Sequence, residues 1–325
     1  MDRSAVLVTG GNSGIGFACA RALASEGWHV LIASRNREAS VEAVRRIVRE
    51  TGNHAVSEMG VDLGSTASVR RLAREIESGD VPLRALVCNA GLQLSAGPRL
   101  SPDGFELTFA VNHLGHFLLT NLLLERLLVN APARIVIVAS GVHDPKLRTG
   151  MPKPAVTDVE TLAATGGPRA GAFDGRLAYV NSKLCNLWFA YELVRRIEAA
   201  NRSTDAHRLT VNAFDPGLVP GSGLARDYPL VLRFIWDRIL PGVARVLTSV
   251  VSGINPPRKA GGALARLVLD PEVAHVSGRY FPSHTRWREA PSSDASYDVD
   301  RARALWEASV RMTGLTSRES PLVQT

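Results

Sequence analysis

Short apolar runs alternate with amphipathic segments along most of the chain. Runs such as Val6–Val8 and Ala85–Cys88 are apolar at consecutive positions, which is typical of strands buried on both faces. The segments between them repeat apolar residues every three or four positions, which predicts helices. Strands are expected at Val6–Val8, Trp28–Ala33, Ala55–Val61, Ala85–Cys88, Arg134–Ala139 and Leu209–Ala213, and helices at Phe17–Ser25, Glu38–Glu50, Ser65–Glu77, Asp103–Leu128 and Arg176–Ala200.

This alternation predicts an α/β fold. Parallel strands joined through helices connect by right-handed crossovers, so the helices are expected on both faces of one parallel sheet. We expect a single doubly wound Rossmann-type domain over residues 1–316, with about seven strands and a ligand crevice at their carboxyl ends. No Pro/Ser-rich linker divides the 325 residues, and residues 317–325 are expected to form a flexible tail.

Composition narrows the class of protein. The net charge is +7, but the basic residues are interspersed with acidic ones on helical segments, so they indicate solvated surfaces rather than a nucleic-acid site. Cys19, Cys88 and Cys185 lie far apart in apolar segments, which argues against a disulfide framework or a zinc site. The first strand begins within five residues of Met1, so we expect no signal peptide and a cytoplasmic protein.

The first strand is followed by three spaced glycines, Gly10, Gly14 and Gly16, at the start of a helix. Glycines allow a sharp turn and let a pyrophosphate approach the free N–H groups at a helix N-terminus, where the dipole favours an anion. The spacing is G-x-x-x-G-x-G, which differs from G-x-G-x-x-G. A glycine-rich turn without a ligand is the alternative.

The end of the second strand indicates which dinucleotide would bind. In such folds an acidic residue about 20 positions past the glycines binds the ribose 2′-hydroxyl of NAD. This chain has Ser34, Arg35, Asn36 and Arg37 there. Guanidinium groups suit a 2′-phosphate, so NADP(H) is predicted, although both arginines could instead merely solvate the next helix.

Two further strand ends are candidates for cofactor contacts. Asp62 could accept a hydrogen bond from the adenine amino group, with Leu63 near the ring, or it could simply be a carboxylate at a helix N-terminus. Asn89, Ala90 and Gly91 end the fourth strand in a turn of small residues, where the backbone could lie against the cofactor.

A candidate reacting centre lies in the sequence YVNSK. Tyr179 and Lys183 are four residues apart and so share a helix face, where a lysine ammonium would favour the phenolate and lower the pKa of the tyrosine. Ser140 ends the fifth strand and could stabilise a developing alkoxide. Asn112 could hold a water that relays protons to Lys183.

Together these motifs resemble the short-chain dehydrogenase/reductase family. The resemblance rests on TGGNSGIG, NAG, the asparagine of VNHLGHF, the serine of IVIVAS, YVNSK and the Pro216–Gly217 turn. It implies that Tyr179 is the acid/base, that Lys183 also holds the nicotinamide ribose, that Ser140 polarises the carbonyl and that Asn112 anchors a water. It implies cofactor contacts from Gly10, Asn12, Ser13, Gly14, Ile15 and Gly16 at the pyrophosphate, and from Pro216, Gly217 and Val219 at the nicotinamide.

Within the family, segments such as HVLIASRN, LVCNAG and AYVNSKLCN look like the branch of retinol dehydrogenases and light-dependent protochlorophyllide reductases. Cys88 and Cys185 fall where the photoenzymes have cysteines. Leu218, however, stands where a photoenzyme would be expected to have cysteine, and the insertion before Tyr179 looks shorter. A photoreductase is therefore kept as an alternative by analogy.

Two segments are candidates for substrate contact. Residues 142–175, rich in Gly and Pro, are expected to form a flap beside the site rather than core. His143 and Lys146 lie on it and are expected to be exposed loop residues, with contact to an acid group of the substrate as the alternative. Residues 224–254 are apolar but interrupted by charges and Pro241, which predicts two amphipathic helices rather than a spanning segment. A lid over a lipophilic ligand, a peripheral membrane contact and a dimer face would all give this pattern.

The sequence thus predicts an NADP(H)-dependent oxidoreductase that transfers hydride between the nicotinamide and a carbonyl or alcohol of a hydrophobic small molecule. The alternatives are light-driven reduction of a tetrapyrrole ring double bond and a non-catalytic NADP-binding regulatory protein. His113 and His116 lie on one helix without a third ligand, so no metal site is predicted. The resemblance suggests a homo-oligomer, although the long apolar helices could equally cap a monomer.

Overall fold

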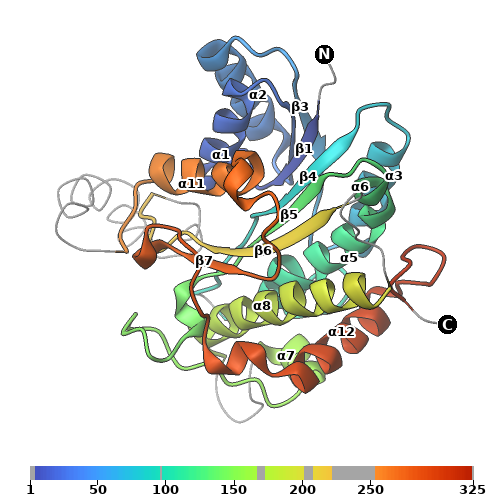
Figure 1. The fold of residues 1–325 in the computed structure, drawn as a ribbon. Coiled ribbons are helices and arrows are strands. Elements are labelled where there is room, and N and C mark those ends of the chain that lie inside the picture. The colour runs from blue at the N-terminus through green and yellow to red at the C-terminus, as the bar shows by residue number, and fades with distance from the viewer. Residues whose placement is uncertain (1–3, 96, 167–172, 201–207, 222–252, 324–325) are drawn as a thin grey trace.

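The computed structural model describes residues 4–95, 97–166, 173–200, 208–221 and 253–323. Its centre is one parallel sheet of seven strands in the order β3-β2-β1-β4-β5-β6-β7, which confirms the predicted doubly wound α/β fold (Figure 1). The strands are β1 (Ala5–Thr9), β2 (His29–Ser34), β3 (Val56–Gly60), β4 (Leu83–Cys88), β5 (Ala133–Val138), β6 (Leu209–Asp215) and β7 (Tyr280–Pro282).

Helices cover both faces of the sheet, as Figure 1 shows. One face packs against α1 (Gly14–Ser25), α2 (Arg37–Thr51) and α11 (Pro257–Leu269). The other packs against α3 (Thr66–Glu77), α5 (Gly115–Leu122), α6 (Leu124–Val129) and α8 (Gly175–Ala199). Because the central strands are buried on both faces, neighbouring residues such as Val6 and Leu7 enter different cores.

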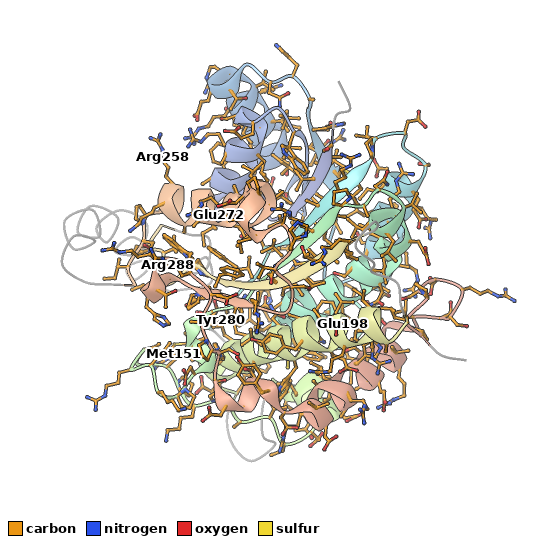
Figure 2. The ribbon with its side chains drawn as sticks, in the orientation of Figure 1. Met151, Glu198, Arg258, Glu272, Tyr280 and Arg288 are labelled. Atoms are coloured by element: carbon orange, nitrogen blue, oxygen red, sulfur yellow. The ribbon has the colours of Figure 1, made fainter. Side chains whose placement is uncertain are left out.

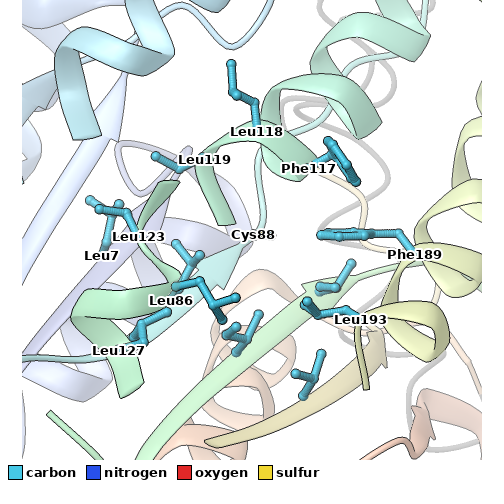
Figure 3. Packing of buried hydrophobic residues seen from close by; sticks show 14 of the residues in the cluster. Leu7, Leu86, Cys88, Phe117, Leu118, Leu119, Leu123, Leu127, Phe189 and Leu193 are labelled. Atoms are coloured by element: carbon cyan, nitrogen blue, oxygen red, sulfur yellow. The ribbon is translucent and has the colours of Figure 1, made fainter. Parts of the chain in front are cut away.

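The second of these cores contains an aromatic centre where α5 meets α8. Figure 3 shows Phe117 and Phe189 next to each other there, with ring centroids 5.4 Å apart and the ring planes tilted by 58°. Trp306, on the C-terminal helix α12 (Val299–Thr313), packs edge-on against Phe117 at 4.9 Å. The core therefore extends from the sheet through α8 to α12.

The long helix predicted over residues 103–128 is wrong in its continuity. The structure has α4 (Leu107–Phe109), a π-helical turn η1 (Ala110–Leu114), α5 and α6 in its place. The carboxylate of Glu106 begins the run by accepting from the N–H groups of Thr108 and Phe109. Hydrophobic spacing cannot show such breaks, because a π turn shifts the helical register without removing the apolar face.

The predicted flexible tail is also wrong for the part that the structure describes. Leu322 is buried, and the Ser320 hydroxyl donates to the Asn121 side-chain oxygen at 2.9 Å. Glu319 accepts from Arg70 at 2.9 Å. Residues 317–323 therefore pack against α3 and α5. The burial of one apolar side chain and two polar contacts offset the conformational entropy that a short terminal segment loses.

The predicted flap over residues 142–175 is only partly a loop. It contains the short helices η2 (Gly141–His143) and α7 (Val159–Thr165), and Leu162 of α7 is buried in an apolar cluster with residues of α8 and α12. His143 is fully buried rather than exposed, whereas Lys146 is exposed and pairs with Asp294 at 2.8 Å. Most of the segment predicted as a lid, 224–254, lies outside the described residues.

Three short helical turns complete the described chain. They are η5 (Pro271–Val273), η6 (Ser283–Thr285) and η7 (Asp294–Tyr297). None of the helices in the described ranges is both long and apolar enough to cross a bilayer. Among the same residues, no three His, Cys, Asp or Glu side chains gather as metal ligands would.

Candidate active site

The glycine turn is built so tightly that side chains would not fit. Gly10 and Gly14 have φ angles of 65° and 56°, a region that favours glycine. A Cβ on Gly16 would lie 2.4 Å from the carbonyl oxygen of Gly10 and 2.5 Å from Nδ2 of Asn89. The turn from β1 into α1 thus brings backbone against backbone and leaves a cradle without side chains, which fits a pyrophosphate at a helix N-terminus.

A methyl group at Gly16 tests this cradle. Gly16→Ala is expected to weaken NADPH binding at least about tenfold, or 1.4 kcal/mol, because the turn must open to admit the Cβ. Gly262→Ala is a matched control: it lies in α11 with nothing within 4 Å of the added Cβ, so binding should not change. Titration of NADPH fluorescence measures both, and equal affinities for the two variants would contradict the assignment.

Thr9, at the end of β1, joins the glycine turn to the predicted turn after β4. Its hydroxyl oxygen accepts from the N–H groups of Asn89 and Ala90 at 2.9 and 3.0 Å. The Asn89 side chain donates back to the carbonyl of Thr9 at 2.8 Å. Two of the predicted cofactor segments are therefore fastened together. The sequence reasoning did not select Thr9, although a threonine ending an apolar strand was a visible signal.

His116 and His113 are held by hydrogen bonds to neighbouring protein groups. Nδ1 of His116 lies 3.1 Å from the carbonyl oxygen of Asn112, so it carries the proton, and Nε2 accepts from Thr9 at 2.9 Å. Nε2 of His113 lies 2.9 Å from the Ser309 hydroxyl. Burial lowers the pKa of His116 to about 4 and that of His113 to about 3, so both rings are neutral.

The polar residues at and after the end of β2, where the 2′-phosphate is predicted to bind, each have a different environment. Ser34 bonds to the Ser40 hydroxyl at 2.6 Å, and Asn36 caps α2 by accepting from Ala39 N–H at 2.9 Å. Arg37 pairs with Glu58 of β3 at 2.9 Å. Arg35 is exposed at the turn. Of the two predicted guanidinium groups, Arg37 is thus already paired with a carboxylate.

The adenine candidates after β3 also have local contacts. The carboxylate of Asp62 accepts from Gly64 N–H at 2.9 Å, and the backbone N–H of Asp62 donates to the hydroxyl oxygen of Ser68 at 3.0 Å. Leu63 is buried against Gly115, where an added Cβ would lie 2.2 Å from its carbonyl oxygen. Asp62 therefore shapes its own loop, and its cofactor contact stays a prediction.

Tyr179 and Lys183 lie on α8 as their spacing predicts. Asp174 caps the start of this helix, because its carboxylate accepts from the N–H groups of Arg176 and Leu177. The Lys183 ammonium lies 5.5 Å from the centroid of the Tyr179 ring, a distance at which cation and ring attract. Lys183 also donates to the carbonyl of Val138 at the end of β5, 3.0 Å away. The lysine thereby ties the helix to the strand that precedes Ser140.

The pKa of the Lys183 ammonium is set mainly by burial. Burial lowers its pKa to about 8, and the nearby Asp215 carboxylate works in the opposite direction. A methyl group on Gly91 would lie 3.6 Å from the ammonium and 3.4 Å from Oδ1 of Asn112. The turn after β4, the π-helical turn and α8 therefore meet at this cation.

This buried cation gives the stability a pH dependence. Below about pH 8 Lys183 is protonated whether folded or unfolded, so its burial penalty is fully present; between about pH 8 and 10 the unfolded state binds more protons, so the penalty fades as pH rises. Lys183→Met removes the penalty. We expect its stability relative to the wild type to decrease by on the order of 3 kcal/mol across this window. Urea unfolding measures it, and a pH-independent difference would contradict the lysine's burial.

Asn112 is held by hydrogen bonds within the protein. Its Nδ2 donates to the carbonyl of Leu92 at 3.0 Å and to the Ser182 hydroxyl at 2.9 Å, while its Oδ1 accepts from Leu92 N–H at 2.8 Å. Both amide hydrogens are used. The side chain therefore braces the turn after β4 against α8, and its predicted role as a water anchor stays a prediction.

Ser140 and the Pro216–Gly217 turn complete the site at the neighbouring strand ends. Ser140 directly follows β5 and is nearly buried, with 9% of its surface exposed. The turn after β6 is fixed by Asp215, which accepts from Gly217 N–H at 2.8 Å, and by Asn255, which donates to the carbonyl of Pro216 at 3.0 Å. Sequence reasoning missed both supports, because their partners lie in backbone atoms that no motif specifies.

The parallel sheet, the glycine cradle and the tyrosine–lysine helix define a class of dinucleotide-binding oxidoreductase. Residues 4–149 match the family model described as short chain dehydrogenase, and nearly the whole chain aligns with curated members at about a third identity. The chain belongs to the short-chain dehydrogenase family, as its motifs predict.

Three relatives illustrate the range of the family around this chain. It is 34% identical over 307 residues to the WW domain-containing oxidoreductase of Danio rerio, covering 94% of this chain and 68% of that protein. It is 33% identical to human Retinol dehydrogenase 13, covering 98% and 87%. It is 32% identical to the chloroplastic Protochlorophyllide reductase of Chlamydomonas reinhardtii, covering 97% and 79%. The predicted branch is confirmed.

Solved structures share the fold at lower identity. The Pseudomonas aeruginosa RhlG/NADP active-site complex matches with a TM-score of 0.61 at 23% identity, covering 86% of this chain and 94% of that one. A putative NAD(P) dependent gluconate 5-dehydrogenase from Beutenbergia cavernae with bound NADP matches with a TM-score of 0.62 at 22% identity, covering 87% and 96%. Both show the same architecture.

Proposed function

We propose that this protein is an NADP(H)-dependent oxidoreductase that interconverts a carbonyl and an alcohol on a hydrophobic small molecule. The observation that carries the proposal is the pairing of Tyr179 with the buried ammonium of Lys183 on the helix facing the strand end at Ser140. A buried cation beside a phenol has a use in proton transfer and little use in a purely structural helix.

The chain's residues divide the work of the proposed reaction. The bound cofactor would supply a hydride. Tyr179 donates a proton to the substrate oxygen as the carbonyl is reduced, and Lys183 favours the resulting phenolate by its charge. The hydroxyl of Ser140 donates a hydrogen bond to the same oxygen as negative charge develops. Asn112 keeps the turn after β4 at its position against α8.

The glycine cradle and Arg35 support NADP(H) as the cofactor. Gly16 lets the turn close against the Gly10 carbonyl without a side chain at the start of α1, which suits a pyrophosphate bound by backbone N–H groups. Two solved proteins of this fold carry NADP. Arg35 is the exposed guanidinium at the end of β2 and would bind the 2′-phosphate, whereas Arg37 is held by Glu58.

The two arginines offer a matched test of this assignment. Arg35→Ala is expected to raise the Kd for NADPH about tenfold or more, because a hydrogen-bonded charge pair contributes roughly 1.5–3 kcal/mol, and to leave NADH binding unchanged. Arg37→Ala should have the smaller effect. Fluorescence titrations with both cofactors provide the comparison. A larger loss in Arg37→Ala, or equal losses for NADH and NADPH, would reassign the phosphate contact.

The function is tested by following NADPH consumption with a panel of lipophilic aldehydes and ketones, and the reverse reaction with the matching alcohols. Oxidation of NADPH with formation of the alcohol is the expected result. Product formation only on illumination with protochlorophyllide would favour ring reduction instead. Cofactor binding without turnover of any compound would favour the regulatory alternative.

The proposal also covers the compartment in which the protein works and one contact for its substrate. All three cysteines are free and buried, which suits the reducing environment of the cytoplasm. Leu218 follows the Pro216–Gly217 turn with 48% of its surface exposed, so an apolar side chain is available beside the site. We propose it as a contact for the lipophilic substrate.

A further inference from the structure

His143 is a fully buried side chain directly behind the candidate catalytic serine. It ends the η2 turn, and its Nδ1 lies 2.6 Å from the carbonyl oxygen of Ser140. A carbonyl can only accept, so Nδ1 carries the proton. Nε2 is then an acceptor, and the N–H of Ser293 donates to it at 3.2 Å. Both ring nitrogens are therefore engaged, in a single neutral tautomer.

The charges near the ring do not alter this state. Burial lowers the pKa of His143, while the Ser140 hydrogen bond and the carboxylates of Asp215 and Asp144 act against that shift. The ring also meets the ring of Tyr280 on β7 edge-on, with centroids 5.3 Å apart (Figure 2 labels Tyr280). With no free nitrogen and no exposed surface, His143 is unsuited to bind substrate or to act as an acid or base.

The segment that receives His143 is itself fastened to the catalytic helix. Ser292 bonds to the hydroxyl of Tyr191 on α8 at 2.7 Å. The indole N–H of Trp188, also on α8, donates to the carbonyl of Ala295 at 2.8 Å. Residues 292–297 thus contact α8 on one side and His143 on the other.

Tyr280 extends the same connection to the turn after β6. Its hydroxyl donates to Asp215 at 3.3 Å, and the second oxygen of that carboxylate accepts from Gly217 N–H at 2.8 Å. His143 therefore lies where the end of β5, the turn beside β6 and α8 are joined by packed and hydrogen-bonded groups.

We propose that His143 is a positioning residue that fixes the backbone of Ser140 relative to α8, and so sets the hydroxyl of Ser140 against the phenol of Tyr179. The inference rests on the proposed function, because it assigns those two groups to the reaction. His143 itself touches neither substrate nor cofactor. Without the ring's bond, the Ser140 carbonyl would keep the longer hydrogen bond from the backbone N–H of His143, 3.3 Å away. Small errors in such geometry reduce turnover strongly.

Two substitutions separate positioning from packing. His143→Phe keeps a ring but removes both hydrogen bonds, and His143→Asn restores a donor near the place of Nδ1 alone. We expect His143→Phe to lower kcat about tenfold or more, with the KM for NADPH little changed, and His143→Asn to recover most of the loss. His113→Phe is the control for removing a buried histidine, since it should lower the melting temperature without changing kcat.

Hydrogen exchange provides a readout that does not need a substrate. In His143→Phe the amides of His143 and Ser293 should both exchange faster, whereas in His143→Asn only that of Ser293 should, because the serine carbonyl keeps its donor. Wild-type kcat in His143→Phe, or wild-type exchange at both amides, would overturn the inference. If the wild type reduces no carbonyl, the proposed function fails, and the exchange pattern alone decides whether His143 holds the Ser140 turn.

Discussion

Replacing Tyr179 by phenylalanine is expected to lower kcat for carbonyl reduction by roughly 10²–10⁴-fold, the contribution of a positioned general acid. The change removes only the phenolic oxygen, and the ring remains packed at the start of α8 beside the Lys183 ammonium. Steady-state oxidation of NADPH with a substrate identified from the carbonyl panel measures the effect.

Two controls make this result specific. The Kd for NADPH and the melting temperature of Tyr179→Phe should stay close to those of the wild type, because the glycine cradle and the core are untouched. A variant that still turns over within tenfold of the wild-type rate would remove Tyr179 from the reaction.

Lys183→Met is expected to give the second largest loss, with kcat for reduction about 10²-fold lower or more and a changed pH profile. The buried ammonium favours the phenolate by its charge, so its removal is expected to raise the pKa of the Tyr179 phenol. Reduction requires the protonated phenol, and the alkaline limb of the profile should therefore move to higher pH. An unmoved limb would mean that another group controls the proton.

The sheet and most of its helices could be predicted because the apolar pattern contains their periodicity. Runs such as Val6–Val8 cannot be solvated on either face, and the spacing in α8 gives one long helix with Tyr179 and Lys183 on a common side. The short β7 and the C-terminal helix α12 were not assigned. A strand of three residues has no usable period.

The errors share a physical origin in tertiary contacts. His143 and Leu162 lie in a Gly- and Pro-rich segment that suggested an exposed flap, yet each is buried by residues more than a hundred positions away or by α8. Ser320 is fixed by Asn121, which is also more than a hundred positions away. Local composition carries no information on such contacts.

In the candidate site too, the motifs predicted the residues but not the contacts that hold them. Motifs identified which residues meet at the strand ends. They did not show that the Asn112 amide donates its hydrogen bonds to Leu92 and Ser182, or that Thr9 accepts from the turn after β4. Those partners are backbone atoms or hydroxyls, which many sequences would supply equally well. The hydrogen bonds that hold the site residues in place could therefore be known only from the structure.

The most direct measurement uses NADPH carrying deuterium at the transferable position of the nicotinamide, a ketone from the panel, and mass spectrometry of the product. Our account predicts an alcohol with one deuterium on its carbinol carbon in the wild type and almost none formed by Tyr179→Phe. A wild-type product without deuterium, or equal labelled product from the two proteins, would contradict hydride transfer assisted by the Tyr179 proton.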